Sequence, residues 1–327
     1  MISPRRFADQ LRRSSLATSL LIGAATAACV LALRATGLLQ SFELDSYDWA
    51  IRHQTEGDKP GSRIVLVAIT EPDIQAMGYP IPDAVLAGAL KLIAQAGPRT
   101  IGLDLYRDLP IPPGHEDLAQ VLATHPEIIT VTKVGGEGTA RVSPPPVLKD
   151  TEQVGANDIV MDRGGIVRRG LLFLDDGPQT VYAFPLRLAL VYLARDGILP
   201  QPGVPDPRDL RLGAVTFRPF GSNEGGYVRA DAAGYQILRD YKDAQAGFPT
   251  FTLSALLSGQ VEAAVLRDKA VLVGIAAESV PDDFYTPYHA GFQAPAPTPG
   301  LVLHAQFLSQ LLQIGRASCR ERVYVLV

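Results

Sequence analysis

Cysteine is scarce in this chain of 327 residues, with Cys29 and Cys319 as the only two. Two such residues exclude a disulfide framework, a cysteine-based zinc cluster and a CxxC redox centre. The signatures of phosphate loops, dinucleotide turns, zinc proteases and nucleophile elbows are missing too, since no GxxxxGK[ST], GxGxxG, HExxH or GxSxG occurs. These absences argue against an enzyme, and we expect neither a cofactor nor a metal.

Hydrophobic residues make up 47% of the chain and charged residues 20%, the balance of an ordinary globular protein. This composition excludes a mainly disordered chain and a protein with many membrane spans. The formal net charge is −4, so no general cationic surface is present to neutralise phosphates. We therefore expect no nucleic acid among the partners.

A strongly apolar run of twenty residues without a charge occupies positions 14–33, SSLATSLLIGAATAACVLAL. As a helix, a run of this length spans about 30 Å, the thickness of the hydrocarbon core of a bilayer. Four arginines precede it and only Arg34 follows closely, and the cytoplasmic flank of a span carries the excess of basic residues. We therefore predict a cytoplasmic basic head at 1–13, a transmembrane helix at 14–34 and an extracytoplasmic body.

A cleaved signal peptide is the alternative, because small residues that suit a cleavage site occur at 24–28. The apolar run is longer than the usual core of a signal peptide, which favours an uncleaved anchor. Either interpretation exports the body.

The body alternates between apolar runs typical of buried strands and periodic runs typical of helices. IVLVAI at 64–69 and TIGLDL at 100–105 are apolar runs, and a helical pattern at 83–96 lies between them. This order predicts a βαβ unit with two parallel strands. AVLVGI at 270–275 is a further buried strand. We therefore predict an α/β fold with a mixed, mainly parallel central sheet and flanking helices.

Two other elements carry clear signals. A pair of apolar runs around an Asp-Gly turn predicts a β-hairpin over 170–184 that joins the central sheet. The final helix is expected to begin near Thr298 and Pro299, with threonine as its cap and proline in its first turn, and to end near Leu312.

Acidic residues beside the predicted strands are the first candidates for a ligand site. Asp104 interrupts a buried strand near its carboxyl end, the edge at which open α/β sheets bind ligands. Glu71 follows the first buried strand and would lie beside Asp104 if the two strands are neighbours. Two acids at one edge indicate a polar or cationic ligand. Asp104 can equally order a loop or pair with Arg107.

Three further groups have both a functional and a purely structural interpretation. His304 shares a predicted helical face with apolar residues, so it is either a hydrogen-bonded core residue or a ligand-binding or pH-sensing one. Asp282 and Asp283 can hold a cation or a polar ligand, or can simply form a turn. Arg168 and Arg169 can pair with an anion or lie at a solvated strand edge.

Several segments of the body form a recognisable series, namely LDSYDWAIR, IVLVAITEPDIQAMGYPIPDAVLAGALKLIAQAGPRTIGLDLY, GANDIVMDRGGIVRRG, GFPTFTLSALLSG, KAVLVGIAAESVPDDFYTPY and PGLVLHAQFLSQLL. In this order and spacing they resemble the type 2 CHASE family, extracellular sensory domains associated with cyclases and histidine kinases. The resemblance covers residues 41–313. The sequence departs from the family pattern at Ile81-Pro82, more often an aromatic-proline pair, and at Gln306, more often asparagine.

The resemblance implies an extracytoplasmic input domain, tethered by an N-terminal membrane helix and followed by further membrane helices and a cytoplasmic output. That output would be a nucleotide cyclase or a kinase, and this chain contains none. We expect an unknown small-molecule or environmental ligand, with Glu71, Asp104, Asp282, Asp283 and His304 as its candidate contacts. We also expect a homodimer, whose membrane helices change geometry when the ligand binds.

Residues 314–327, IGRASCRERVYVLV, look like the translation of a sequencing adapter joined to a truncated reading frame. A genuine basic tail is the alternative. We therefore place the sensory domain at 41–313 and leave the tail out of the reasoning on the fold.

The sequence thus favours a sensory input domain of a membrane-bound signalling protein, cut off before its output. An exported enzyme or solute-binding protein with a cleaved leader, using Glu71, Asp104 and Asp282 around a cleft, is the alternative from another class. A scaffold that only presents a protein-binding surface is the third hypothesis.

Overall fold

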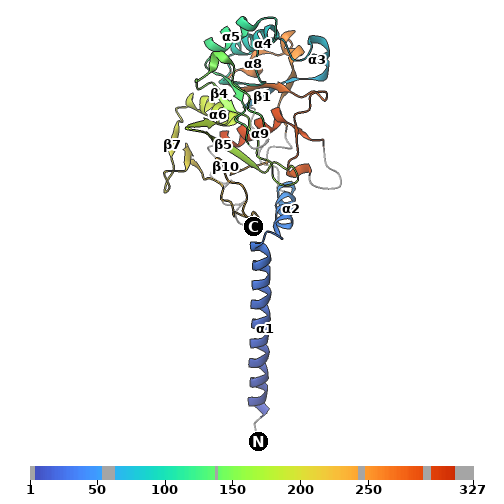
Figure 1. Ribbon diagram of the computed structural model, residues 1–327, viewed down its shortest axis with the longest axis vertical. Helices are drawn as coiled ribbons and strands as arrows, with labels where there is room; N and C mark the ends of the chain where they lie inside the picture. The colour runs from blue at the N-terminus through green and yellow to red at the C-terminus, as the bar shows by residue number, and fades with distance from the viewer. Residues whose placement is uncertain (1–3, 54–62, 137–138, 242–246, 290–295, 314–327) are drawn as a thin grey trace.

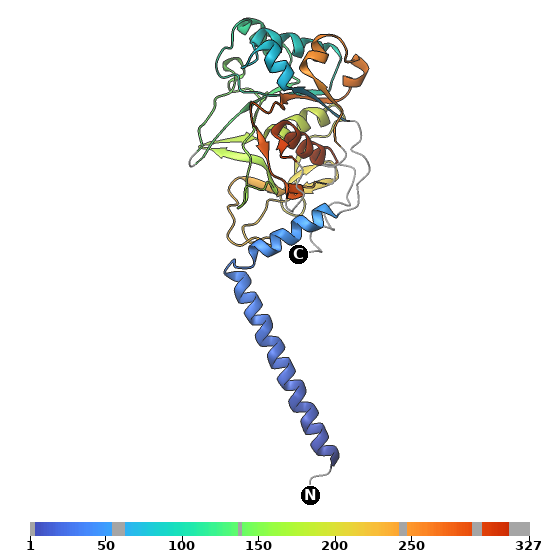
Figure 2. The same cartoon turned by 90° about the vertical axis from the view of Figure 1, so that its right-hand side faces the viewer.

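A long helix is attached to a folded body in the computed structural model of the chain (Figure 1). Helix α1 (Pro4–Ala35) projects away from the body, and helix α2 (Gln40–Arg52) runs across the base of the body at a steep angle to α1 (Figure 2). The structure describes residues 4–53, 63–136, 139–241, 247–289 and 296–313, with side chains from residue 15 onward. The predicted tail at 314–327 and the side chains of the basic head at 1–13 lie outside the described residues.

The centre of the body is a six-stranded sheet in which every neighbouring pair of strands runs parallel. This confirms the predicted fold class and the strands expected near 64–69, 100–105 and 270–275. In spatial order the strands are β11 (Thr250–Thr252), β1 (Ile64–Ile69), β12 (Ala270–Ile275), β2 (Thr100–Asp104), β3 (Ile128–Thr132) and β4 (Val154–Ala156).

Helices cover both faces of this sheet, because its inner strands send apolar side chains alternately into two cores. In β1, Val65 and Val67 belong to one core, whereas Leu66 and Ala68 belong to the other. The first core is completed by α3 (Glu71–Met77), α4 (Asp83–Gln95), α5 (His115–Thr124), α7 (Leu253–Leu257) and α8 (Ala263–Leu266). The second core is completed by α6 (Phe184–Ala194) and α9 (Gly300–Leu312).

Small antiparallel sheets lie in the half of the body nearer α1 (Figure 1). They comprise β10 (Tyr235–Leu238) with β5 (Arg169–Asp176) and β6 (Gln179–Tyr182), β7 (Pro200–Pro202) with β8 (Leu210–Leu212) and β9 (Val215–Phe217), and β13 (Asp283–Phe284) with β14 (Thr298–Pro299). Two 3-10 helices, η1 (Pro146–Leu148) and η2 (Pro287–His289), complete the described elements.

The hairpin predicted over 170–184 is present as β5 and β6, but its expected place in the central sheet is wrong. Strand β5 pairs with β6 and β10, and one bridge between Ala156 and Ala183 connects this region to the edge strand β4. The chain passes from β6 directly into α6 at Phe184, which packs on the face of the central sheet. The hairpin therefore leaves the plane of that sheet instead of extending it.

The start of the final helix also differs from the expectation. Thr298 and Pro299 pair with Phe284 and Asp283 as strand β14, and α9 begins at Gly300. No side-chain cap precedes α9, because the threonine is held in the extended pairing. The end of the helix at Leu312 is as predicted.

Glycine at position 155 allows α6 to approach the edge of the sheet. A Cβ on Gly155 would lie 2.5 Å from the Cα atom of Phe184, a backbone atom that cannot rotate away. We expect Gly155→Ala to lower the free energy of unfolding by about 1–3 kcal/mol, measured by urea denaturation. Gly136→Ala is the control, because its Cβ would meet nothing within 4 Å. Equal denaturation midpoints for the two variants would show that the close approach costs nothing.

Candidate functional site

Three of the predicted site residues come together at the carboxyl edge of the central sheet. Asp104 is the last residue of β2, His304 lies near the start of α9, and Asp282 immediately precedes β13. The Nε2 atom of His304 lies 3.9 Å from Oδ2 of Asp104, and both side chains are buried. The fold thus unites an acid and a histidine that are far apart in the sequence.

Two glycines allow these elements to approach one another. A Cβ on Gly274 of β12 would lie 3.2 Å from the Cβ atom of Asp104, and a Cβ on Gly300 would lie 2.1 Å from Oδ2 of Asp282. The backbone N–H of Gly300 also donates a hydrogen bond to the carbonyl of Asp282, over 2.7 Å. The carboxylate of Asp282 is therefore held against the first residue of α9, where helix N–H groups favour negative charge.

Asn157 and Tyr106 extend this group, and the sequence analysis missed both. Asn157 Nδ2 donates to Asp104 Oδ1 over 3.5 Å, and the hydroxyl of Tyr106 donates to Asn157 Oδ1 over 2.9 Å. Each follows the carboxyl end of a strand of the central sheet, a signal that could have identified them. Arg107, the other expected partner of Asp104, pairs with a different acid. Its Nε atom lies 3.2 Å from Oδ1 of Asp83.

Burial dominates the proton affinities of this group. It raises the pKa of Asp104 to about 6, against the opposing hydrogen bond from Asn157. Burial and the positive charge of Arg239 lower the pKa of His304 to about 4, whereas Asp282 acts in the opposite direction. Asp282 is exposed as a whole residue, but its carboxyl group lies against Gly300, and its pKa is raised, first by loss of solvation and then by the charge of Asp104. At neutral pH the imidazole is therefore uncharged, and the two carboxyl groups lose their protons at a higher pH than ordinary aspartates do.

Arg239, which follows β10, is a buried cation close to this site. Its Nη2 atom donates to the carbonyl of Leu303 over 2.5 Å, and its guanidinium lies 5.2 Å and 5.1 Å from the ring centres of Tyr241 and Phe307. Burial lowers its pKa. In the described part of the chain no ion pair joins Arg239 to a carboxylate, so aromatic rings and a carbonyl are what compensate its charge.

Glu71 and Asp283 do not join the group, contrary to the expectation for the candidate set. Strand β12 lies between β1 and β2, so Glu71 is not beside Asp104. Its carboxylate accepts a hydrogen bond from the backbone N–H of Ser279, over 3.2 Å. Asp283 is an exposed residue of β13. Over the described residues, no cluster of three or more His, Cys, Asp or Glu side chains fits a metal ion.

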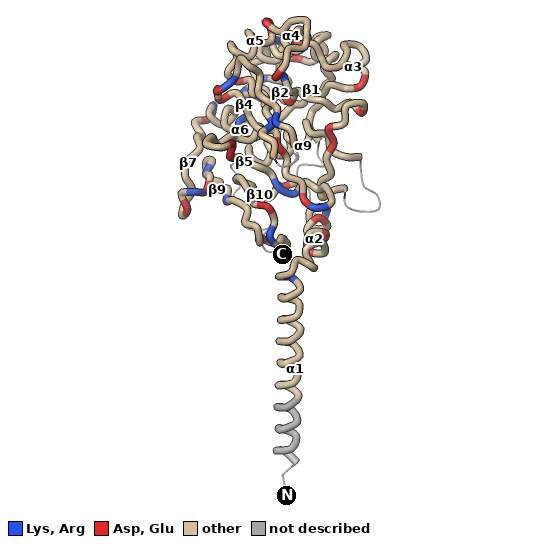
Figure 3. Tube along the Cα trace, viewed as in Figure 1, with Lys and Arg blue, Asp and Glu red and all other residues tan. Residues whose placement is uncertain are grey.

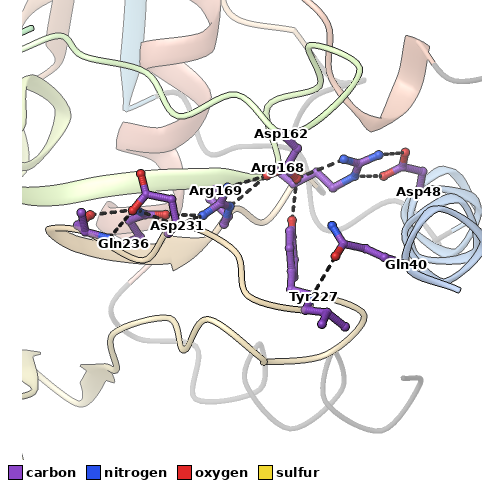
Figure 4. A network of polar contacts seen from close by, with 10 residues as sticks. Gln40, Asp48, Asp162, Arg168, Arg169, Tyr227, Asp231 and Gln236 are labelled. Atoms are coloured by element: carbon purple, nitrogen blue, oxygen red, sulfur yellow. Dashed lines mark hydrogen bonds and ion pairs between the residues drawn. The ribbon is translucent and has the colours of Figure 1, made fainter. Parts of the chain in front are cut away.

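Arg168 and Arg169 form the centre of a buried ionic network, so the predicted solvated strand edge is wrong (Figure 4). Arg168 Nε and Nη2 donate to the two carboxylate oxygens of Asp48, each over 2.7 Å. Arg168 Nη1 lies 3.0 Å from Asp162, which also accepts from Arg169 over 2.6 Å. Two guanidinium groups thus face two carboxylates, and the matched charge makes their burial possible.

Hydrogen bonds satisfy the remaining donors of the network. The hydroxyl of Tyr227 donates to Asp162 over 2.6 Å, and Arg169 Nη1 donates to Gln236 Oε1 over 2.6 Å (Figure 4). Burial alone would lower the pKa of Arg168, but the hydrogen bonds to Asp48 and Asp162 raise it above its ordinary value. Because Asp48 belongs to α2, this network fixes α2 to the body.

Helix α1 has no such attachment to the body along most of its length. Residues 15–35 have a mean hydropathy of 2.1 with none of the side chains buried, which makes this helix long and apolar enough to cross a membrane. Arg34 is the single charged residue in its described side chains (Figure 3). Arg34 Nε lies 3.1 Å from Glu43 of α2, and Nη2 donates to the carbonyl of Gly225 over 2.6 Å.

These features define an α/β domain that carries an apolar helix at its N-terminus and a buried acid–histidine group at the edge of its sheet. The chain belongs to the CHASE2 domain family, whose sequence model matches residues 25–325. This match confirms the predicted family. CHASE2 domains are extracellular sensory, non-catalytic domains of signalling proteins. Comparison with curated proteins and with solved structures gave no match.

Proposed function

We propose that this chain is the extracytoplasmic sensory input of a membrane-bound signalling protein, anchored by α1 with its N-terminus in the cytoplasm. The proposal rests on the exposed apolar helix α1. This helix is joined to the body through α2, which the ion pair of Asp48 and Arg168 holds in place. The basic residues ahead of the span favour this orientation. The output would be a nucleotide cyclase or a kinase that follows further membrane helices.

The proposed ligand site is the group of Asp104, Asp282 and His304. A continuous series of contacts leads from it to α2, the helix that follows the membrane helix. His304 follows Leu303, whose carbonyl accepts from Arg239, and the backbone N–H of Arg239 donates to the carbonyl of Arg168. Arg168 in turn holds Asp48 of α2. A ligand that prefers one arrangement of this series shifts the population of membrane-helix geometries in the proposed homodimer.

The size of this effect depends on the difference in affinity between the two arrangements. A tenfold preference corresponds to about 1.4 kcal/mol, which modulates an output enzyme without switching it completely. The body supplies no catalysis of its own in this scheme.

Reporter fusions after Gln313 test the proposed topology. We expect alkaline phosphatase, which is active outside the cytoplasm, to be active there, and green fluorescent protein, which needs the cytoplasm, to stay dark. Deletion of residues 14–34 is the matched control and should reverse both signals. A fluorescent fusion of the intact chain would contradict the proposal.

The exported enzyme or binding protein with a cleaved leader is distinguished by the mature N-terminus. An anchored sensor keeps Met1 or its neighbour at the N-terminus and stays with membranes in high salt. A mature chain that begins within or after 24–28 and is released by salt would favour the alternative.

A further inference from the structure

Helix α2 carries apolar side chains on two opposite sides, and only one of these sides is covered. Leu44, Asp48 and Ile51 are buried against the body. On the other side, Phe42 is 71% exposed and Trp49 is 58% exposed. Leu38, in the turn before α2, is 67% exposed as well. We call Leu38, Phe42 and Trp49 the outer face of α2.

The connection to α1 determines where the outer face lies. Residues 36–39 are all that separates α1 from α2, and four residues reach at most about 14 Å. Arg34 contacts both Glu43 and Gly225, so the elbow between the helices is held at the base of the body. Because the opposite side of α2 packs on the body, its outer face is turned toward the end of the body from which α1 projects (Figure 2).

We infer that the outer face of α2 binds the lipid surface of the extracytoplasmic leaflet, at the boundary between headgroups and acyl chains. The inference rests on the proposed function, since it requires α1 to span the bilayer. The four-residue connection keeps α2 close to the end of the span, and the interfacial layer at that depth is where tryptophan and other aromatic side chains are enriched. Apolar side chains of an amphipathic helix enter this layer while its other face remains covered.

The charge of the outer face specifies the kind of lipid. The exposed positions of α2 include the acid Asp45 and no lysine or arginine. The basic residue at its end, Arg52, donates to the carbonyl of Pro287 in the body, over 2.9 Å. Apolar insertion rather than attraction to anionic headgroups therefore drives the contact, and zwitterionic lipid is sufficient.

Trp49 provides the test, because it is the one tryptophan of the chain. The full chain is reconstituted in phosphatidylcholine vesicles whose acyl chains carry bromine near the headgroup, and its fluorescence is compared with that in unlabelled vesicles. We expect bromine to quench Trp49. The matched control is Leu92→Trp in a Trp49→Phe background, because Leu92 is exposed on α4 at the far end of the body from α1 (Figure 1). This control should keep its fluorescence.

Flotation of the vesicles separates this inference from the proposed anchor. If the protein floats with the vesicles and Trp49 is not quenched, the lipid contact is wrong while the anchor remains. If Trp49 emission moves to shorter wavelength only as the protein-to-lipid ratio rises, again without quenching, a second copy of the chain covers the outer face and the inference is wrong. If the protein does not float, the anchor fails, and the lipid contact fails with it.

Discussion

Asp48→Ala is expected to lower the free energy of unfolding by about 3–5 kcal/mol, the cost of leaving a buried charge without its partner. The substitution removes two hydrogen bonds from Arg168, whose side chain is almost completely buried. The second carboxylate, Asp162, is already shared with Arg169 and Tyr227 and does not replace Asp48. Urea denaturation of the protein in detergent measures the change.

An exposed ion pair that also has two hydrogen bonds provides the control. Arg141 donates to both oxygens of Asp176, over 2.7 Å and 2.6 Å, but its side chain is 59% exposed. Asp176→Ala should therefore cost at most about 1 kcal/mol, as is usual for surface ion pairs. Equal losses at Asp48 and Asp176 would show that burial adds nothing to the network and would contradict the prediction.

A paired replacement separates the charge from the packing. Asp48→Leu combined with Arg168→Met removes both members of the ion pair and keeps apolar volume at the interface between α2 and the body. Such replacements of buried ion pairs are often neutral or stabilising. We expect the double variant to recover most of the stability that Asp48→Ala loses. If it does not, the loss arises from contacts other than the unpaired charge.

The second large effect is a pH dependence of stability, which is small in the native protein because two contributions cancel. Asp104 has a pKa of about 6 in the fold against an ordinary 3.8, so the folded state binds its proton more tightly, and stability falls as pH rises through this interval. His304 has a pKa of about 4 against an ordinary 6.5, so the unfolded state binds the proton more tightly, and stability rises with pH. Each contribution amounts to roughly 3 kcal/mol, and they oppose each other.

Single substitutions should reveal the two contributions. The free energy of unfolding of Asp104→Asn should rise by roughly 3 kcal/mol from pH 4 to pH 6.5, because the opposing contribution of Asp104 is removed and that of His304 remains. The free energy of unfolding of His304→Gln should fall by a similar amount over the same interval, because only the contribution of Asp104 remains. Urea denaturation at a series of pH values measures both. Parallel pH profiles for the two variants would exclude the assignment.

Local patterns in the sequence identified most of the central elements. Continuous apolar runs located β1, β2 and β12, because a strand covered on both faces needs apolar residues at every position. The order of the strands was beyond this reasoning. Strand β12 enters between β1 and β2 through packing between distant segments, and no local signal in IVLVAI or TIGLDL specifies its neighbour.

The candidate site was partly predictable for the same reason. The carboxyl edge of the sheet identified Asp104, and the segment between β12 and β13 contained Asp282. The contact between His304 and Asp104 depends on how α9 packs against β12, which the helical pattern does not determine. The buried pair of Asp48 and Arg168 was missed because adjacent arginines usually lie at the surface, and their partners are far away in the sequence.

The position of β12 has a consequence for how the protein is made. The two neighbours of β1 in the sheet, β11 and β12, both come late in the chain. During synthesis the hexapeptide IVLVAI therefore waits without a partner strand while most of the body emerges. Such apolar, uncharged segments are prone to self-association, and sheets built from distant strands form slowly. We therefore expect the nascent chain to need protection of this segment until β11 and β12 have been synthesised.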